Sequence, residues 1–197
     1  MGRCCGRDAC RTARVRARFC GGKEGHILAG YGVDELNIVS YSEDWRSSTL
    51  SNFAPTPFTL RCGEGDLRFA TVESLWQGIK WPPGSEMRRR VFGMAGIDAK
   101  RAGSQVPYPE VLEFCEEKFS PGSREHHALA ERAMREKMMQ NPVVQRALLA
   151  TGALRFTHHV LDEQGEPVAD SRTLPAAVFC EILSRLRDEL RASGQAG

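Results

Sequence analysis

The hydrophobic pattern of this chain changes its period near Val72, and that change constrains the fold more than any other feature. Before it, residues 36–41 alternate apolar and polar side chains, and residues 57–62 and 67–71 flank a glycine-containing turn. These patterns predict a strand and a β-hairpin. Beyond Val72, apolar residues recur at three- and four-residue spacings, which predicts helices. Since 197 residues is the usual size of one domain, we predict a single α+β domain, mostly helical, with a small antiparallel sheet.

Proline, glycine and capping residues predict where the helices begin and end. A first helix over residues 72–81 must stop before Pro82-Pro83, because proline lacks the amide donor. Asn141 and Pro142 favour the start of a helix that Gly152 ends in a left-handed conformation. The other expected elements are a helix over residues 123–140, a helix over 143–151, a strand over 154–160, and a final helix capped by Thr173 with Phe179, Ile182, Leu183, Leu186 and Leu190 on its core-facing stripe.

The net charge of +2 conceals an uneven distribution along the chain. Residues 1–24 contain seven basic and two acidic side chains, a net charge of +5, so the remainder carries −3. A mildly acidic body excludes a domain whose whole surface follows a nucleic-acid backbone. The same arm holds four of the seven cysteines, at spacings that match neither a zinc site nor a secreted disulfide framework. We expect a basic, disordered and reduced arm over residues 1–26 and one domain over residues 27–197.

The segment from Thr71 to Lys80 contains the strongest candidate for a reactive site. On a helix, Glu73, Gln77 and Lys80 lie at positions i, i+4 and i+7 and therefore share one face. An acid and an amine held near an apolar wall perturb each other's pKa, which is one route to a nucleophilic lysine and a proton-transferring carboxyl. The same spacing also fits an ordinary ion pair on a solvated helix face, and spacing alone does not decide between the two.

Five short motifs, in order along the chain, resemble those of the NADAR superfamily, whose members include the YbiA-like N-glycosidases. They are Leu50-Ser-Asn-Phe53, Thr71-x-Glu73-x-x-x-Gln77-x-x-Lys80, Ala99-Lys-Arg-Ala-Gly103, Lys137-x-x-Gln-Asn-Pro142 and Leu148-Leu-Ala-Thr-Gly152. Each motif is weak alone, but their shared order and spacing make a more specific signal. The resemblance spans about residues 36–190 and implies the α+β fold of that superfamily.

The resemblance implies an enzyme that cleaves an N-glycosidic bond at a ribose with no metal or organic cofactor. Lys80 matches the family lysine that attacks the anomeric carbon and holds the opened sugar as a Schiff base, and Glu73 matches its acid/base partner. The resemblance places Asn52 where the family uses a side-chain amide near the ribose and base. We expect the substrate-binding residues to be Asn52, Phe53, Trp76, Gln77, Arg101 and Thr157. Trp76 can equally fill the core. Arg101 is a good phosphate ligand if Gly103 opens a helix N-terminus.

The implied substrates are nucleotides or nucleic acids that carry ADP-ribose. We expect ADP-ribose attached to guanine in nucleic acid first, ahead of the phosphoribosylated pyrimidines of riboflavin synthesis. Family members that are paired with DNA-modifying toxins imply a DNA ADP-ribosyltransferase toxin as a genetic partner. No apolar run is long enough for a signal peptide or a membrane span, which predicts a cytoplasmic protein without membrane contact.

The segment 156–165 departs from the Trp-Gly and glycine-rich pattern of the family. Either Thr157, His158 or His159 takes over a substrate contact there, or activity is lost. Adjacent histidines on a strand point to opposite faces, so at most one of them reaches a site. Two other classes of protein stay open: a non-catalytic module that binds NAD or ADP-ribose, and a protein that binds nucleic acid through its arm. The basic run Arg88-Arg89-Arg90 either meets phosphates or begins a solvated helix.

Overall fold

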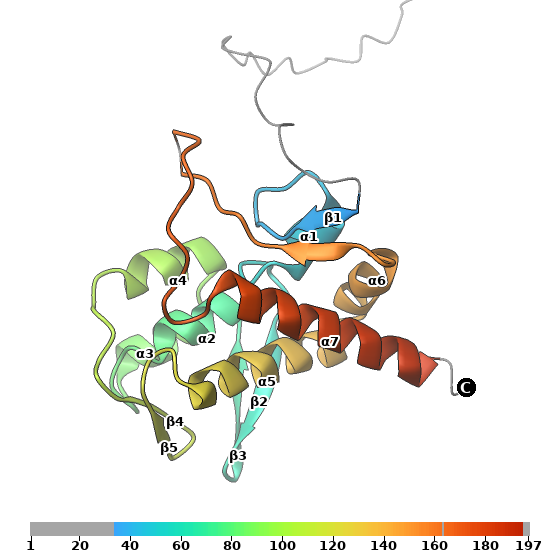
Figure 1. Cartoon of the computed structure of the whole chain (residues 1–197). Coiled ribbons are helices and arrows are strands. Elements are labelled where there is room, and N and C mark those ends of the chain that lie inside the picture. Colours follow the sequence, from blue (N-terminus) through green and yellow to red (C-terminus); the bar gives the residue numbers. More distant parts are fainter. Residues whose placement is uncertain (1–33, 163, 195–197) are drawn as a thin grey trace, which may run out of the picture. The chain divides into compact units, whose positions relative to one another are not determined.

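A computed structural model describes residues 34–162 and 164–194 of the chain (Figure 1). Within these residues the chain forms seven helices and six short strands. The predicted α+β class, mostly helical, is therefore confirmed. The arm predicted over residues 1–26 lies outside the described residues, so it stays a prediction. In the described part of the chain, no helix combines the length and the apolar character that crossing a membrane requires.

The strands form three separate two-stranded sheets in the described residues, rather than one small antiparallel sheet. The expected antiparallel hairpin is β2 (Phe58–Cys62) with β3 (Gly65–Phe69), and a second hairpin is β4 (Leu112–Phe114) with β5 (Glu117–Phe119). The third pair, β1 (Glu35–Asn37) with β6 (Arg155–Thr157), is parallel. The sequence therefore predicted the first hairpin but neither the second hairpin nor the parallel pair.

Strand β1 ends earlier than the predicted strand 36–41, because a helix side chain replaces the sheet partner. The hydroxyl of Ser47, on α1 (Trp45–Leu50), donates to the Asn37 carbonyl at 2.6 Å. The same oxygen accepts the Val39 amide at 3.0 Å. Ser47 is fully buried, so these bonds satisfy backbone groups that water cannot reach.

The remaining helices are α2 (Val72–Gly78), α3 (Glu86–Phe92), α4 (Gly96–Gly103), α5 (Arg124–Gln140), α6 (Pro142–Ala150) and α7 (Ala176–Gly194). The predicted bounds of α5 and α6 are correct to within a residue. Ser123 caps α5 by accepting the His126 amide at 3.3 Å. Gly152 follows α6 with a φ of +54°, as predicted for a left-handed helix end.

The prediction that Thr173 caps the final helix is wrong. Helix α7 begins at Ala176, whose amide donates to Oδ1 of Asp170 at 2.9 Å. The Thr173 hydroxyl instead lies 3.4 Å from the hydroxyl of Tyr108. The intervening Pro175 favours a helix start at this point, because its missing amide donor would be unsatisfied in the first turn anyway.

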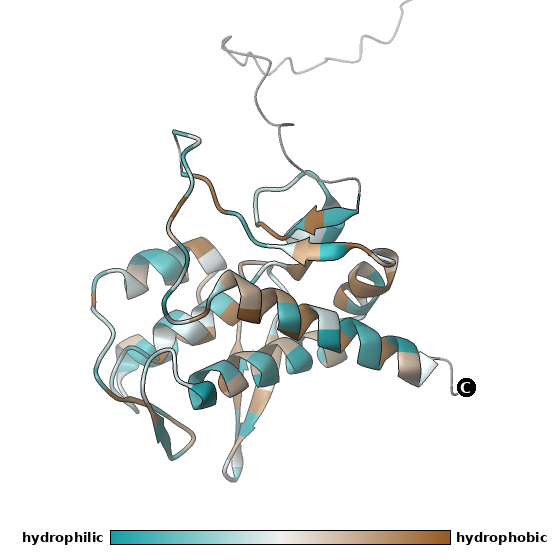
Figure 2. Cartoon of the chain, in the orientation of Figure 1, coloured by the Kyte–Doolittle hydropathy of each residue, from teal (hydrophilic) through white to brown (hydrophobic). Residues whose placement is uncertain are grey.

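The main core cluster contains buried residues of α2, α5, α6 and α7 and of the hairpin β2–β3, and α7 packs against α5 within it (Figure 1). Four of the five predicted stripe residues of α7 are buried: Phe179, Ile182, Leu183 and Leu186. The fifth, Leu190, is partly buried at the edge of the same cluster. Figure 2 shows the corresponding alternation of hydrophobic and hydrophilic residues along both helices. The helical period in the sequence therefore identified the core face of α7.

A disulfide joins Cys62, at the end of β2, to Cys115, in the turn between β4 and β5. The two Cα atoms are 5.0 Å apart. Sequence analysis did not anticipate this bond, because the partners are 53 positions apart and only the packing of the two hairpins brings them together. Among the described cysteines, Cys180 is free.

Candidate active site

Helix α2 is buried on both its apolar and its polar face. Val72 and Leu75 are at most 1% exposed, and Glu73 and Gln77 are only 6% and 3% exposed. Helices α3, α4 and α5 pack around α2 (Figure 1). The interpretation as an ordinary ion pair on a solvated helix face is therefore wrong. Buried polar side chains need partners inside the protein. The row on α2, which consists of Glu73, Gln77 and Lys80, has such partners.

A capping box fixes the start of α2. The Thr71 hydroxyl accepts the Ser74 amide at 2.9 Å, and the Ser74 hydroxyl accepts the Thr71 amide at 3.0 Å. The helix ends at Gly78 rather than at the predicted Trp81, in a tighter turn where the Lys80 amide donates to the Gln77 carbonyl at 3.4 Å. Lys80 therefore lies on the turn that follows α2, on the same side as Glu73 and Gln77.

Gln77 links the acid to the amine. Its amide nitrogen donates to Oε1 of Glu73 at 2.8 Å, and its Oε1 accepts a hydrogen bond from Nζ of Lys80 at 3.4 Å. Nζ of Lys80 also donates to the carbonyl of Gly103 at the end of α4. The amine of Lys80 is therefore held by two uncharged oxygens. The structure thus brings together three of the residues predicted for the site, with Gln77 between the two proposed reactive groups.

The ion pair of Glu73 is made by a residue that sequence reasoning missed. Nζ of Lys100, on α4, lies 3.8 Å from Oε1 of Glu73, and the Lys100 side chain is 56% exposed. Helix α4 comes this close because Gly103 has no side chain: a Cβ there would lie 1.9 Å from Oε1 of Gln77. The motif Ala99–Gly103 was the available signal, but it does not reveal which of its side chains reaches α2.

The environments of the two reactive groups push their pKa values toward each other. Burial raises the pKa of the Glu73 carboxyl, while the Lys100 ammonium and the Gln77 amide oppose that rise. Burial lowers the pKa of the Lys80 amine, the positive charge of Lys100 lowers it further, and Glu73 opposes both. Tyr108 forms the next wall of the site, with its ring centroid 4.7 Å from Nζ of Lys80. The pKa shifts of Glu73 and Lys80 both favour the uncharged form of the group concerned.

Asn52 lies beside the N-terminal end of α2. Its carbonyl accepts the Glu73 amide at 2.9 Å. Its side-chain Oδ1 is buried and accepts no hydrogen bond from the described residues. An acceptor in that state can take a donor from a bound molecule. Phe53 lies on the far side of this turn, against Gly96 of α4, and lines a hollow of about 340 Å³ with residues such as Thr56.

Trp76 belongs to the core rather than to an open base-stacking surface. It is 6% exposed and stacks on the ring of His126, with centroids 3.8 Å apart and planes 4° apart. His126 is fully buried, and burial lowers its pKa to about 4. In the part of the chain that the structure describes, no cluster of three or more His, Cys, Asp or Glu side chains could hold a metal ion.

Arg101 was expected to bind phosphate if Gly103 opened a helix N-terminus. Gly103 instead ends α4, so that condition is not met. Arg101 extends into solvent with a side chain that is 74% exposed, and it pairs with Asp98 at 3.5 Å. It therefore lies one residue beyond Lys100 on the outer side of α4 with no helix N-terminus beside it.

Thr157 lies in β6 and is buried, with its hydroxyl 3.5 Å from Oδ1 of Asn37 in β1. It is therefore a partner in the parallel strand pair, and it is not among the residues hydrogen-bonded to the row on α2. The two neighbouring histidines follow β6 instead of lying in the predicted strand 154–160: His158 packs on Phe179, and His159 is exposed.

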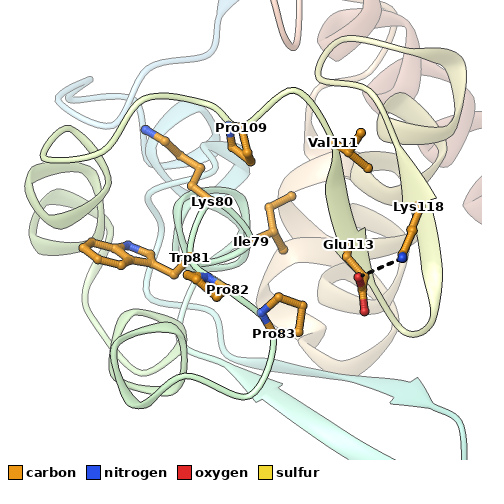
Figure 3. Close-up of a pocket in the computed structure, with 9 residues that line it drawn as sticks. All are labelled: Ile79, Lys80, Trp81, Pro82, Pro83, Pro109, Val111, Glu113 and Lys118. Carbon is orange, nitrogen blue, oxygen red and sulfur yellow. Dashed lines mark ion pairs between the residues drawn. The ribbon is translucent and has the colours of Figure 1, made fainter.

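Beyond Lys80 the surface forms an open groove of about 430 Å³ (Figure 3). Trp81, Pro82 and Pro83 line one part of it, and the ion pair between Glu113 and Lys118 lines another. In Figure 3, Nζ of Lys80 points away from that ion pair.

Arg88, from the basic run, does not face this groove as a free cation. It is 6% exposed and donates to the carbonyls of Trp81 and Glu113 at 3.3 and 2.6 Å. The interpretation of the run as a solvated helix start or a phosphate-binding cluster is therefore wrong for this first arginine, whereas Arg89 and Arg90 are exposed.

The fold and the polar row on α2 now place the chain in a class. Residues 44–188 match the family described as bacteriophage protein GP30.3, so the chain belongs to that family. A protein of 17.1 kDa from the Gp30–rIII intergenic region of Enterobacteria phage T4 is 30% identical over 161 residues, which cover 80% of this chain and 100% of the relative.

The E. coli protein YbiA, known from an NMR structure, has the same fold. It superposes with a TM-score of 0.57 at 20% sequence identity, over 86% of this chain and 93% of YbiA. At that identity the likeness concerns the fold. The predicted resemblance to the NADAR superfamily is confirmed at this level.

Proposed function

We propose that this protein hydrolyses an N-glycosidic bond between a ribose and a nucleobase, with Lys80 as nucleophile and Glu73 as acid and base. The observation that carries the proposal is the setting of Lys80. Its amine is bound by the neutral oxygens of Gln77 and Gly103, while the adjacent carboxylate pairs with Lys100. Burial and the positive charge of Lys100 lower the pKa of this amine, and the neutral amine is the nucleophilic form.

In the first step the Lys80 amine attacks the anomeric carbon. The bond from that carbon to the base nitrogen breaks, and the Glu73 carboxylate passes a proton from the new ammonium to the leaving base. The remaining proton on the lysine nitrogen then moves to the ring oxygen as the ring opens to a Schiff base. The raised pKa of Glu73 makes its carboxylate a better acceptor for these protons.

Water completes the reaction. The Glu73 carboxylate takes a proton from water as the hydroxide adds to the imine carbon, and it returns that proton to the lysine nitrogen. The carbon–nitrogen bond breaks as Glu73 passes the proton of the new hydroxyl to the lysine nitrogen. Lys80 leaves as a free amine, so one water is consumed and both residues regain their starting states.

Among substrates we propose ADP-ribose attached to guanine in nucleic acid. Asn52 offers a buried acceptor next to Glu73 for a ribose hydroxyl or a base N–H. Arg101 offers positive charge on α4 for phosphates. A DNA ADP-ribosyltransferase toxin as genetic partner belongs to this same proposal.

Reductive trapping tests the proposal directly. The protein is incubated with guanine- and thymine-linked ADP-ribosyl DNA and with riboflavin intermediates, with and without borohydride, and followed by mass spectrometry. We expect release of free ADP-ribose from the guanine substrate and a borohydride-dependent sugar adduct on the peptide that contains Lys80. Lys80→Arg keeps the charge but is too weakly nucleophilic, so it should form no adduct and show no turnover.

Unchanged turnover in Lys80→Arg and in Glu73→Gln would overturn the assigned roles. Tight binding of ADP-ribose without turnover of any substrate would instead favour the non-catalytic binding module. Turnover of the riboflavin intermediates alone would retain the reaction and replace the substrate.

A further inference from the structure

Two lysines from different helices approach the same buried carboxyl. Lys80 reaches the row from the end of α2, and Lys100 reaches it from α4. Oε1 of Glu73 bonds to Gln77 at 2.8 Å and lies 3.8 Å from Nζ of Lys100. The two lysines therefore have different partners, since Lys80 is bound to uncharged oxygens.

We propose that Lys100 is a positioning residue, which takes the Glu73 carboxylate in an ion pair and so leaves Lys80 as the free amine of the site. The proposal rests on the reaction proposed above but concerns a residue outside the row on α2. Without Lys100, the nearest cation to the buried carboxylate would be Lys80 itself. An ammonium paired with a buried carboxylate keeps its proton and cannot attack.

The other titratable groups described near Lys80 do not form an ion pair with the Glu73 carboxylate. Tyr108 presents its ring to Nζ of Lys80, and burial raises its pKa to about 12, so it is uncharged at neutral pH. His126, from α5, is uncharged above about pH 4. Arg88, from α3, is bound to backbone carbonyls. Lys100 is thus the cation in contact with the Glu73 carboxylate among the described residues.

The exposure of Lys100 makes the proposal testable without damage to the fold. More than half of its side chain is in solvent, so Lys100→Met removes the charge and leaves no cavity. Lys100→Arg keeps the charge. Arg89→Met is the matched control, because Arg89 is an exposed cation on the neighbouring helix α3.

The measurement is competitive labelling of lysines with acetic anhydride across a pH series, with the modified peptides quantified by mass spectrometry. It gives the titration midpoint of Lys80 and needs no substrate, so it remains informative even if the proposed reaction fails. We expect Lys100→Met to raise the midpoint by about half a pH unit or more, because a repelling charge is lost and Glu73 becomes free to pair with Lys80. Lys100→Arg and Arg89→Met should match the wild type.

An unchanged or lower midpoint in Lys100→Met would overturn the proposal, as would an equal shift in Arg89→Met. Where turnover is measurable, the pH–rate profile of Lys100→Met should move to higher pH. A uniform loss of rate at every pH would indicate a structural role only and would also contradict the proposal.

Discussion

Lys137 is a buried lysine outside the row on α2. It is 3% exposed on α5, and its ammonium donates to the carbonyl of Ser51 at 2.7 Å. Burial lowers its pKa to about 7. The bond holds the turn that carries Asn52, so Lys137 supports the candidate site from behind.

This burial predicts an alkaline rise in stability. The pKa of Lys137 is about 7 in the folded chain, against 10.5 for an unperturbed lysine, so the unfolded chain binds more protons between these values. The free energy of unfolding should therefore rise with pH over that range, by up to about 1.4 kcal/mol per pH unit. Urea unfolding of the wild type and of Lys137→Met at pH 7 to 10 measures the difference. Parallel curves for the two proteins would contradict the prediction.

At the residue scale, the sequence predicted the part of the site that lies on one helix. The 3.6-residue period predicted that Glu73, Gln77 and Lys80 share one face, but it left open whether that face is a reactive site or a solvated surface. The positions of Lys100 and Tyr108 beside this row could not be predicted in this way, because they depend on how α4 and the following loop pack against α2. The burial of Trp76 was also left open, because an indole one turn from a reactive acid fits a core position and a binding surface equally well.

At the element scale, the contact of α2 with α4 determines the geometry of the site. Gly103 permits this contact, because any side chain there would overlap Gln77. Gly78 has the same role toward α3, since a Cβ there would lie 2.4 Å from the ring of Phe92. Two glycines thus let three helices meet around one polar row.

Gly103→Ala should therefore displace the Gln77 side chain and destabilise the fold by about 1–3 kcal/mol through overpacking. Gly93→Ala is the matched control, since its added Cβ would meet the nearest atom at an ordinary 3.6 Å. Chemical denaturation of both variants gives the comparison. Equal stability of the two variants would show that α4 moves away freely.

The elements that the sequence predicted well are those with long periodic patterns. Helix α5 has 17 residues and a serine cap, and its bounds were clear. Helices α1, α3 and α4 have only six to eight residues, which is about two turns. A hydrophobic period of 3.6 residues is hard to recognise over so short a stretch. The pairing of β1 with β6 carries no local signal, because the partner strands are three residues long and far apart in sequence.

At the scale of the whole molecule, the disulfide between Cys62 and Cys115 links the two hairpins and closes a long loop that contains α2, α3 and α4. A cross-link of that length restricts the unfolded chain and typically contributes about 2–4 kcal/mol. Reduction should therefore lower the midpoint of thermal unfolding, measured by circular dichroism with and without reductant. The double variant Cys62→Ser/Cys115→Ser should melt at the reduced midpoint in both conditions. A drop of equal size in the double variant would assign the effect to other cysteines.

The parallel pair of β1 with β6 also has a consequence for the chain during its synthesis. Leu36 pairs with Phe156, so the first described strand has no partner until the ribosome has made β6. Leu36 and Ile38 end up buried, and until then they remain uncovered. Contacts this distant in sequence form slowly, because loop closure must come first. A nascent chain shorter than about 160 residues should therefore be a substrate for chaperones and proteases, however well its central helices have already folded.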